Sequence, residues 1–140
     1  MTRAVEDSNR RLLRARDAMD LAYGQPLDIP SLARIAFMSQ AHFIRAFRAA
    51  FGETPHRYLQ RRRIERAMYL LRRTDRNVTD VCFDVGFTSL GTFSRTFLEV
   101  VGEAPSVYRL REPVVGVPTC FAMAWGRPST FGEASGRRGG

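Results

Sequence analysis

The sequence predicts an all-α protein, in which two helix-turn-helix subdomains are joined by one long linker helix, with about seven helices in total. Two observations predict this fold. Apolar residues recur at intervals of three and four, in segments that glycine or proline ends. The chain also repeats itself: between residues 43–61 and 93–111, at an offset of 50, eight of 19 positions are identical, namely Phe43/Phe93, Arg45/Arg95, Phe47/Phe97, Gly52/Gly102, Glu53/Glu103, Pro55/Pro105, Tyr58/Tyr108 and Arg61/Arg111.

The first half of the chain predicts three helices. The first covers about 7–23 and is ended by Gly24 and Pro26. A second, short helix begins near Pro30. After a turn, Ser39 is a good N-cap for a third helix, in which phenylalanines follow every four residues until Gly52: Phe43, Phe47 and Phe51.

The linker helix is expected over 55–73, which makes it about 28 Å long at about 1.5 Å per residue. The order of the first half then recurs, with helices at 78–85 and 89–101 and a last short helix from Pro105. Ahead of residue 93 the repeat offset is 49, so the second turn should hold one extra residue. The predicted units are therefore 7–54, 55–73 and 74–111, followed by a flexible tail at 112–140, in which Val114, Val115, Phe121 and Trp125 can dock on the domain.

Composition favours a polyanionic partner. The formal net charge is +8, and all 22 basic residues are arginine, either through a coding bias or through selection for bidentate contacts. Cys82 and Cys120 lie 38 residues apart without a C-x-x-C pair, which argues against a metal site and for reduced thiols, with Cys82 buried in a helix. The polar N-terminal segment and the absence of a long apolar run predict a cytoplasmic protein that does not enter the membrane.

No arrangement of catalytic side chains is visible in the sequence. Its two histidines and two cysteines are scattered over different predicted elements, so no nucleophile has a base nearby. We therefore expect no enzymatic activity and no cofactor, and we read His42 and His56 as surface residues.

Each second helix of the repeat carries an outward stripe. Because the phenylalanines face inward, the stripe of the first unit consists of Gln40, Ala41, Ile44, Arg45 and Arg48, and that of the second of Leu90, Gly91, Thr92 and Arg95. Arginine reads guanine and glutamine reads adenine in the DNA major groove. One such stripe alone is more simply a solvated face, but the recurrence of arginine at 45 and 95 favours base contacts.

These stretches resemble the DNA-binding domain of the AraC/XylS family of transcription regulators. The first reads LARIAFMSQAHFIRAFRAAFGETPHRYLQRRRIERA and the second VCFDVGFTSLGTFSRTFLEVVGEAPSVYR. The resemblance covers 33–109, or 7–111 with the leading helix. It implies seven helices, with two recognition helices in successive major grooves, where the base-facing or phosphate-facing positions match Ala41, Ile44, Arg45, Leu90, Gly91, Thr92 and Arg95.

The chain departs from the family pattern in its recognition helices. Ala41, Ile44, Leu90 and Gly91 replace larger polar residues, and Leu98 replaces a basic one, so the second unit should read sequence less strictly. Most members of the family also carry a separate effector-sensing or dimerisation domain. We expect none within these 140 residues, because the resemblance to the DNA-binding domain takes up 7–111. We expect either a stand-alone regulator controlled by its abundance or a partner subunit that supplies the signal.

Phosphate contacts are expected from arginines of the linker helix and from the N-terminal amides of the two short helices. The candidates are Arg57, Arg61, Arg62, Arg63, Ser31 and Thr79. The run 61–63 cannot point one way on a helix, so one or two of its arginines should touch DNA.

The expected partners are double-stranded DNA, bound by a monomer, and RNA polymerase. A rival reading is a helical adaptor that binds RNA polymerase or another regulator without DNA. Its contact surface would be formed by the tail around Trp125 or by three apolar residues of the last long helix: Leu98, Val100 and Val101.

Overall fold

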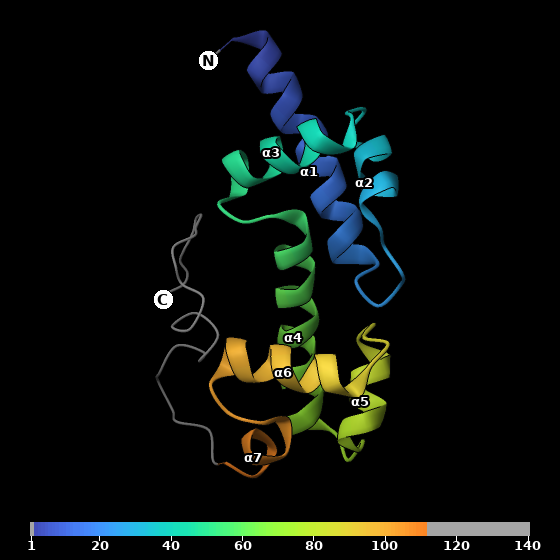
Figure 1. Cartoon of the computed structure of the whole chain (residues 1–140), viewed down its shortest axis with the longest axis vertical. Coiled ribbons are helices and arrows are strands. Elements are labelled where there is room, and N and C mark those ends of the chain that lie inside the picture. The colour runs from blue at the N-terminus through green and yellow to red at the C-terminus, as the bar shows by residue number, and fades with distance from the viewer. Residues whose placement is uncertain (1, 112–140) are drawn as a thin grey trace.

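The computed structural model describes residues 2–111, and the predicted tail lies outside them. The described chain folds into seven α-helices, which confirms the predicted class: α1 (Arg3–Leu21), α2 (Ile29–Ile35), α3 (Gln40–Phe51), α4 (Pro55–Arg73), α5 (Val78–Asp84), α6 (Leu90–Val101) and α7 (Pro105–Leu110). Figure 1 shows α4 as a central connecting helix, with α1, α2 and α3 at one end and α5, α6 and α7 at the other.

The first unit surrounds its own hydrophobic core. Helices α1, α2 and α3 pack together and against the first half of α4, because each turns an apolar face inward. The buried side chains are Leu12, Ala15, Met19, Leu32, Ala33, Ala36, Phe43, Phe47, Tyr58 and Leu59.

The second unit has a separate core built on the second half of α4. Helices α5, α6 and α7 all contact α4 there. The buried side chains are Ile64, Ala67, Met68, Leu71, Val81, Cys82, Val85, Phe87, Phe93, Phe97, Val100, Val101 and Tyr108. Burial raises the pKa of the Cys82 thiol, as expected for a small apolar residue of a core.

The repeat is visible in the packing of aromatic rings. In the first unit Phe47 lies between Phe43 and Tyr58, with ring centroids 5.7 Å apart in both pairs. In the second unit Phe97 lies between the matching Phe93 and Tyr108, at 5.8 Å and 5.5 Å. Each group of three rings joins α3 or α6 to the helix that follows it.

Capping side chains explain where the observed helix ends differ from the expected ones. Helix α1 begins at Arg3 rather than near residue 7, because the Thr2 hydroxyl accepts a hydrogen bond from the Val5 amide. Helix α2 begins at Ile29, one residue before the expected proline, because Asp28 caps it. Helix α4 has the predicted bounds, from Pro55 to Arg73.

The extra residue expected in the second turn is present. Helix α2 ends at Ile35 and α5 at Asp84, 49 positions apart, whereas the caps Ser39 and Ser89 are 50 apart. The Met38 amide donates to the Ala33 carbonyl and the matching Phe87 amide to the Cys82 carbonyl, so both turns start alike. The added residue is therefore Thr88, next to the cap.

Candidate nucleic-acid interface

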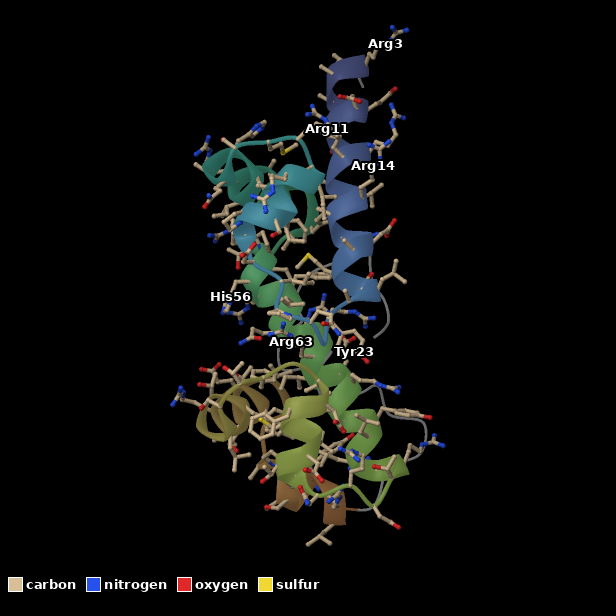
Figure 2. The ribbon with its side chains drawn as sticks, turned by 90° about the vertical axis from the view of Figure 1, so that its right-hand side faces the viewer. Arg3, Arg11, Arg14, Tyr23, His56 and Arg63 are labelled. Atoms are coloured by element: carbon tan, nitrogen blue, oxygen red, sulfur yellow. The ribbon has the colours of Figure 1, made fainter. Side chains whose placement is uncertain are left out.

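The two candidate recognition helices, α3 and α6, are built alike. Ser39 and Ser89 cap their first turns by accepting hydrogen bonds from the amides of His42 and Thr92. Figure 2 shows the teal α3 and the gold α6 on the same side of α4, with α1 on the opposite side. The fold thus presents both helices on one face.

The sequence-predicted base-facing residues all lie on that pair of helices, away from the cores. Eight of the nine residues are exposed and one, Thr92, is half-buried; the exposed set is Gln40, Ala41, Ile44, Arg45, Arg48, Leu90, Gly91 and Arg95. The two stripes are therefore exposed surfaces, whereas the phenylalanines of the same helices are buried in the cores.

Seven of the eight identities in the repeat have a role inside the protein. The aromatic pairs are buried, the two glycines cap α3 and α6, and the two prolines begin α4 and α7. Arg61 binds Glu53 at 2.7 Å, and the matching Arg111 binds Glu103 at 3.0 Å. The remaining pair is Arg45 and Arg95: both are exposed, and no residue in 2–111 forms an ion pair or hydrogen bond with either side chain.

The arginine run 61–63 has partners inside the protein. Arg61 also binds Glu65, and Arg62 binds Glu65 and Asp20. Arg63 donates to two backbone carbonyls, of Tyr23 and Gln25. The sequence could show the run but not the long-range acceptors, which come from α1 and the loop after it, and each of these arginines would have to leave a partner to reach a phosphate.

The N-termini of the two short helices differ from the anion sites expected there. The Asp28 carboxylate accepts the Ser31 amide at 2.9 Å, and hydrogen bonds from Ser31 lower the pKa of Asp28. A phosphate near Ser31 would therefore face a carboxylate. In the second unit the neutral Asn77 caps α5, and Thr79 is exposed.

The two halves of the repeat differ in surface chemistry at three matching positions. From the sequence we predicted this difference only at Leu98. Three exposed arginines of the first unit and the linker helix correspond to exposed apolar residues of the second unit: Arg34 to Phe83, Arg48 to Leu98 and Arg57 to Val107. Residues 74–111 hold four arginines and five acidic residues, a net charge of −1. The signal was available in the alignment of the repeat with itself.

The surface expected for a helical adaptor needs a correction. Leu98 is 52% exposed, but Val100 is 0% and Val101 6% exposed, because both belong to the core of the second unit. A helix that turns Phe93 and Phe97 inward also turns Val100 and Val101 inward, at spacings of three and four.

Within residues 2–111, no group of three or more His, Cys, Asp or Glu side chains is placed to hold a metal ion. None of the helices described there is long and apolar enough to cross a membrane.

Comparisons with known proteins agree with this architecture. Residues 32–111 match the family described as "Helix-turn-helix domain". The regulatory protein SoxS of Salmonella typhimurium is 37% identical over 87 residues, which cover 62% of this chain and 81% of SoxS. The chain spans only 13% to 34% of four other curated relatives, among them an HTH-type transcriptional regulator of Haemophilus influenzae that is 36% identical over 81 residues, 58% of this chain and 27% of that protein.

Solved structures extend the similarity to the arrangement of the helices. The DNA-binding domain of AdpA, crystallised with a target DNA, is 29% identical with a TM-score of 0.68, over 71% of this chain and 89% of that one. The C-terminal domain of AraT, a response regulator of Geobacillus stearothermophilus, is 25% identical with a TM-score of 0.68, over 76% and 89%. With its repeated helix-turn-helix unit, its linker helix and these relatives, the chain belongs to the AraC/XylS family of DNA-binding transcription regulators.

Proposed function

We propose that one monomer of this regulator inserts α3 and α6 into successive major grooves on one face of a DNA duplex. The observation that carries the proposal is the Arg45/Arg95 pair, the one repeated identity that packing, capping and ion pairing within residues 2–111 leave unexplained. An exposed arginine near the middle of a recognition helix suits the O6 and N7 acceptors of guanine.

The length of α4 supports binding to two grooves. Its 19 residues give about 28 Å at about 1.5 Å per residue. Successive major grooves on one face of B-DNA are about 34 Å apart. Two unequal units in one chain then stand in for the two halves of a dimer, so the expected site is asymmetric and about 20 base pairs long.

The two recognition helices have unequal roles in this proposal. Arg45 has Gln40 and Arg48 on its stripe, and these polar groups can fix the register of a guanine contact. Arg95 lies on a stripe with Leu90 and Gly91, in a unit whose net charge is −1. The first unit therefore supplies most of the discrimination between DNA sequences. Arg95 acts chiefly by contacting the DNA phosphate backbone.

Phosphate contacts are proposed for the exposed Arg57 on the first turn of α4 and for the exposed Thr79 at the start of α5. Arg61, Arg62 and Arg63 are left out of the proposed interface because they are half-buried, whereas Arg57 is exposed. Ser31 is left out because the Asp28 carboxylate accepts its amide.

Alanine variants of the two arginines test the proposal. Bound sequences are first selected from random DNA, and each variant is then titrated with the selected and an unrelated duplex at several salt concentrations. For Arg45→Ala we expect the affinity ratio of the two duplexes to shrink about 5- to 150-fold, since a bidentate guanine contact contributes about 1–3 kcal/mol of discrimination. For Arg95→Ala we expect both affinities to fall together, with a salt slope shallower by about one.

Arg14→Ala is the matched control. It removes the same charge from an exposed site on α1, and Figure 2 places Arg14 on the side of the molecule opposite α3 and α6. It should leave the affinity ratio unchanged. A loss of discrimination in Arg95→Ala with none in Arg45→Ala would contradict the assigned roles, and equal affinity of the parent for all duplexes would contradict the function.

We also propose RNA polymerase as a protein partner, a cytoplasmic location and the absence of catalytic activity. The exposed Phe83 on α5 is the candidate for this protein contact, because Leu98 and Val107 match Arg48 and Arg57 and therefore lie toward the DNA in this proposal. Stoichiometric binding of polymerase without DNA, and no salt-dependent duplex binding, would favour an adaptor instead.

A further inference from the structure

One arginine joins parts of both units. Arg63, in the middle of α4, donates through Nε to the Tyr23 carbonyl at 2.7 Å and through Nη2 to the Gln25 carbonyl at 3.0 Å. Its guanidinium group also lies over the ring of Phe87, 5.9 Å from the centroid. Figure 2 shows Arg63 and Tyr23 between the two units. The side chain therefore connects the loop after α1, in the first unit, with the turn before α6, in the second.

The loop after α1 lies against the second unit. Tyr23 packs against the buried residues of both cores. A Cβ atom added to Gly24 would lie 3.3 Å from the Asp84 carbonyl oxygen at the end of α5. The two units thus touch through backbone groups, in addition to sharing α4.

Gly86 shows what this contact requires of the second turn. The matching residue of the first turn is Phe37, which adopts a φ of 55° and is 71% exposed, so the turn itself accepts a side chain. Gly86 has a φ of 102°, and an added Cβ atom would lie 2.9 Å from Arg63 Nε and 2.9 Å from the Tyr23 carbonyl oxygen. Both the backbone conformation of Gly86 and the closeness of Arg63 and the Tyr23 carbonyl therefore favour glycine at this position.

The acceptors of Arg63 differ from those of its neighbours. Arg61 and Arg62 bind carboxylates at the ends of flexible side chains. Arg63 binds two carbonyls of one short loop, whose positions are set by the backbone. Because the guanidinium group donates from a fixed planar fork, these two hydrogen bonds place Arg63 directly against the backbone of the loop.

We propose that Arg63, Gly86 and the backbone of Tyr23 and Gln25 form an inter-unit clasp that holds the two units at one angle. Arg63 is then a positioning residue, which presents α3 and α6 as one rigid pair. The consequence for DNA rests on the proposed function: with the clasp intact, binding of the first unit places the second at its groove and raises its effective concentration there.

The angle between the units can be measured without DNA. Spin labels at Ala49→Cys and Glu99→Cys, exposed and matching positions of α3 and α6, report the distance between the recognition helices by double electron–electron resonance. The background carries Cys120→Ser and Cys82→Ala, because the first unit has Ala33 at the position that matches Cys82. The parent should give a narrow distance distribution, and Arg63→Ala and Gly86→Ala should broaden it roughly twofold, as for a released hinge.

Two further variants separate the clasp from charge and from folding. Arg66→Ala removes an exposed arginine of the same helix, stacked on Tyr69, and should leave the distribution narrow. Arg63→Lys keeps the charge, and it should broaden the distribution because one ammonium group cannot reproduce the guanidinium geometry. If Gly86→Ala does not fold, as judged by circular dichroism, the two Arg63 variants decide.

A second experiment measures the affinity of the parent and the variants for two DNA duplexes. One carries the full, two-part selected site, and the other carries only the half bound by the first unit. Arg63→Ala should lose about tenfold in affinity for the two-part site and little for the half site, since only the linked second contact depends on the angle. Unchanged distance distributions in the Arg63 variants would overturn the clasp. Broadened distributions without any loss on the two-part site would leave the clasp standing and contradict the two-groove proposal.

Discussion

At the residue scale, the buried Tyr58 occupies a position that the repeat shares with Tyr108, and its hydroxyl forms a hydrogen bond with an aspartate of α1. The Tyr58 hydroxyl donates to Asp20 Oδ1 at 2.8 Å, and Arg62 Nε donates to the same oxygen at 3.1 Å. Burial, together with the neighbouring Asp20 carboxylate, raises the pKa of Tyr58 well above 10. The ionised phenolate is thus disfavoured in the folded protein.

This shift predicts a loss of stability in alkali. Below pH 10 the tyrosine is protonated in both states; above it the unfolded chain releases the proton first, so the free energy of unfolding falls as pH rises. Tyr58→Phe should lower the free energy of unfolding by about 1 kcal/mol at pH 7 and weaken the decline above pH 10. Urea unfolding between pH 7 and 11 measures both effects.

Tyr69→Phe is the control for Tyr58→Phe, since Tyr69 is 51% exposed on the same helix. It should leave the free energy of unfolding at pH 7 nearly unchanged, because a half-exposed ring gives no buried hydroxyl to leave without a partner. An equal effect of both substitutions would show that the hydrogen bond between Tyr58 and Asp20 contributes nothing specific.

At the element scale, α3 and α6 differ in residue type at one matching position of the first turn, where one has alanine and the other glycine. Ala41 lies in the first turn of α3 and Gly91 in the first turn of α6. A Cβ atom added at Gly91 would make an ordinary contact of 3.7 Å with Ser89 Oγ. The second helix therefore carries a glycine that packing within the protein does not require.

Exchanging these residues should shift stability in opposite directions. Gly91→Ala is expected to raise the free energy of unfolding by about 0.5–1 kcal/mol, and Ala41→Gly to lower it by a similar amount, because glycine loses more backbone entropy in a helix. Urea titration of both variants measures the shifts. A destabilised Gly91→Ala would mean that α6 needs a glycine at this position for a reason inside the fold.

Most of the elements could be predicted from the sequence, because apolar spacing, proline and glycine mark them locally. The bounds of α4 and the N-cap of α3 follow from Thr54-Pro55 and Ser39 in this way. The start of α1 depends on a hydrogen bond at Thr2, in a polar segment without apolar periodicity. The outward stripes were predictable, since the phenylalanine spacing fixes which face is buried.

The hydrogen-bond and ion-pair partners of the linker arginines could not be predicted from the sequence. Spacing shows that residues 61–63 point in different directions, but Asp20 and the Tyr23 carbonyl are about 40 positions away along the chain. Such partners become neighbours only when α1 has packed against α4. Long-range polar contacts of this kind identify the linker arginines that have a structural role within residues 2–111.

At the scale of the whole molecule, charge is distributed unevenly between the units. The linker residues 55–73 carry seven arginines and one glutamate, whereas residues 74–111 have a net charge of −1. Electrostatic attraction to DNA should therefore come chiefly from the first unit and the linker, with the second unit adding contact area. The salt dependence of duplex binding should therefore come mostly from the first unit and the linker.

The central claim is that one monomer reads two successive major grooves, and hydroxyl-radical footprinting at saturation on a selected duplex tests it most directly. The account predicts protection on one face of the helix in two patches about 10 base pairs apart, within a site of about 20 base pairs, at one protein per duplex. Protection confined to a single patch of about 10 base pairs, or a two-fold palindrome occupied by two copies, would contradict it.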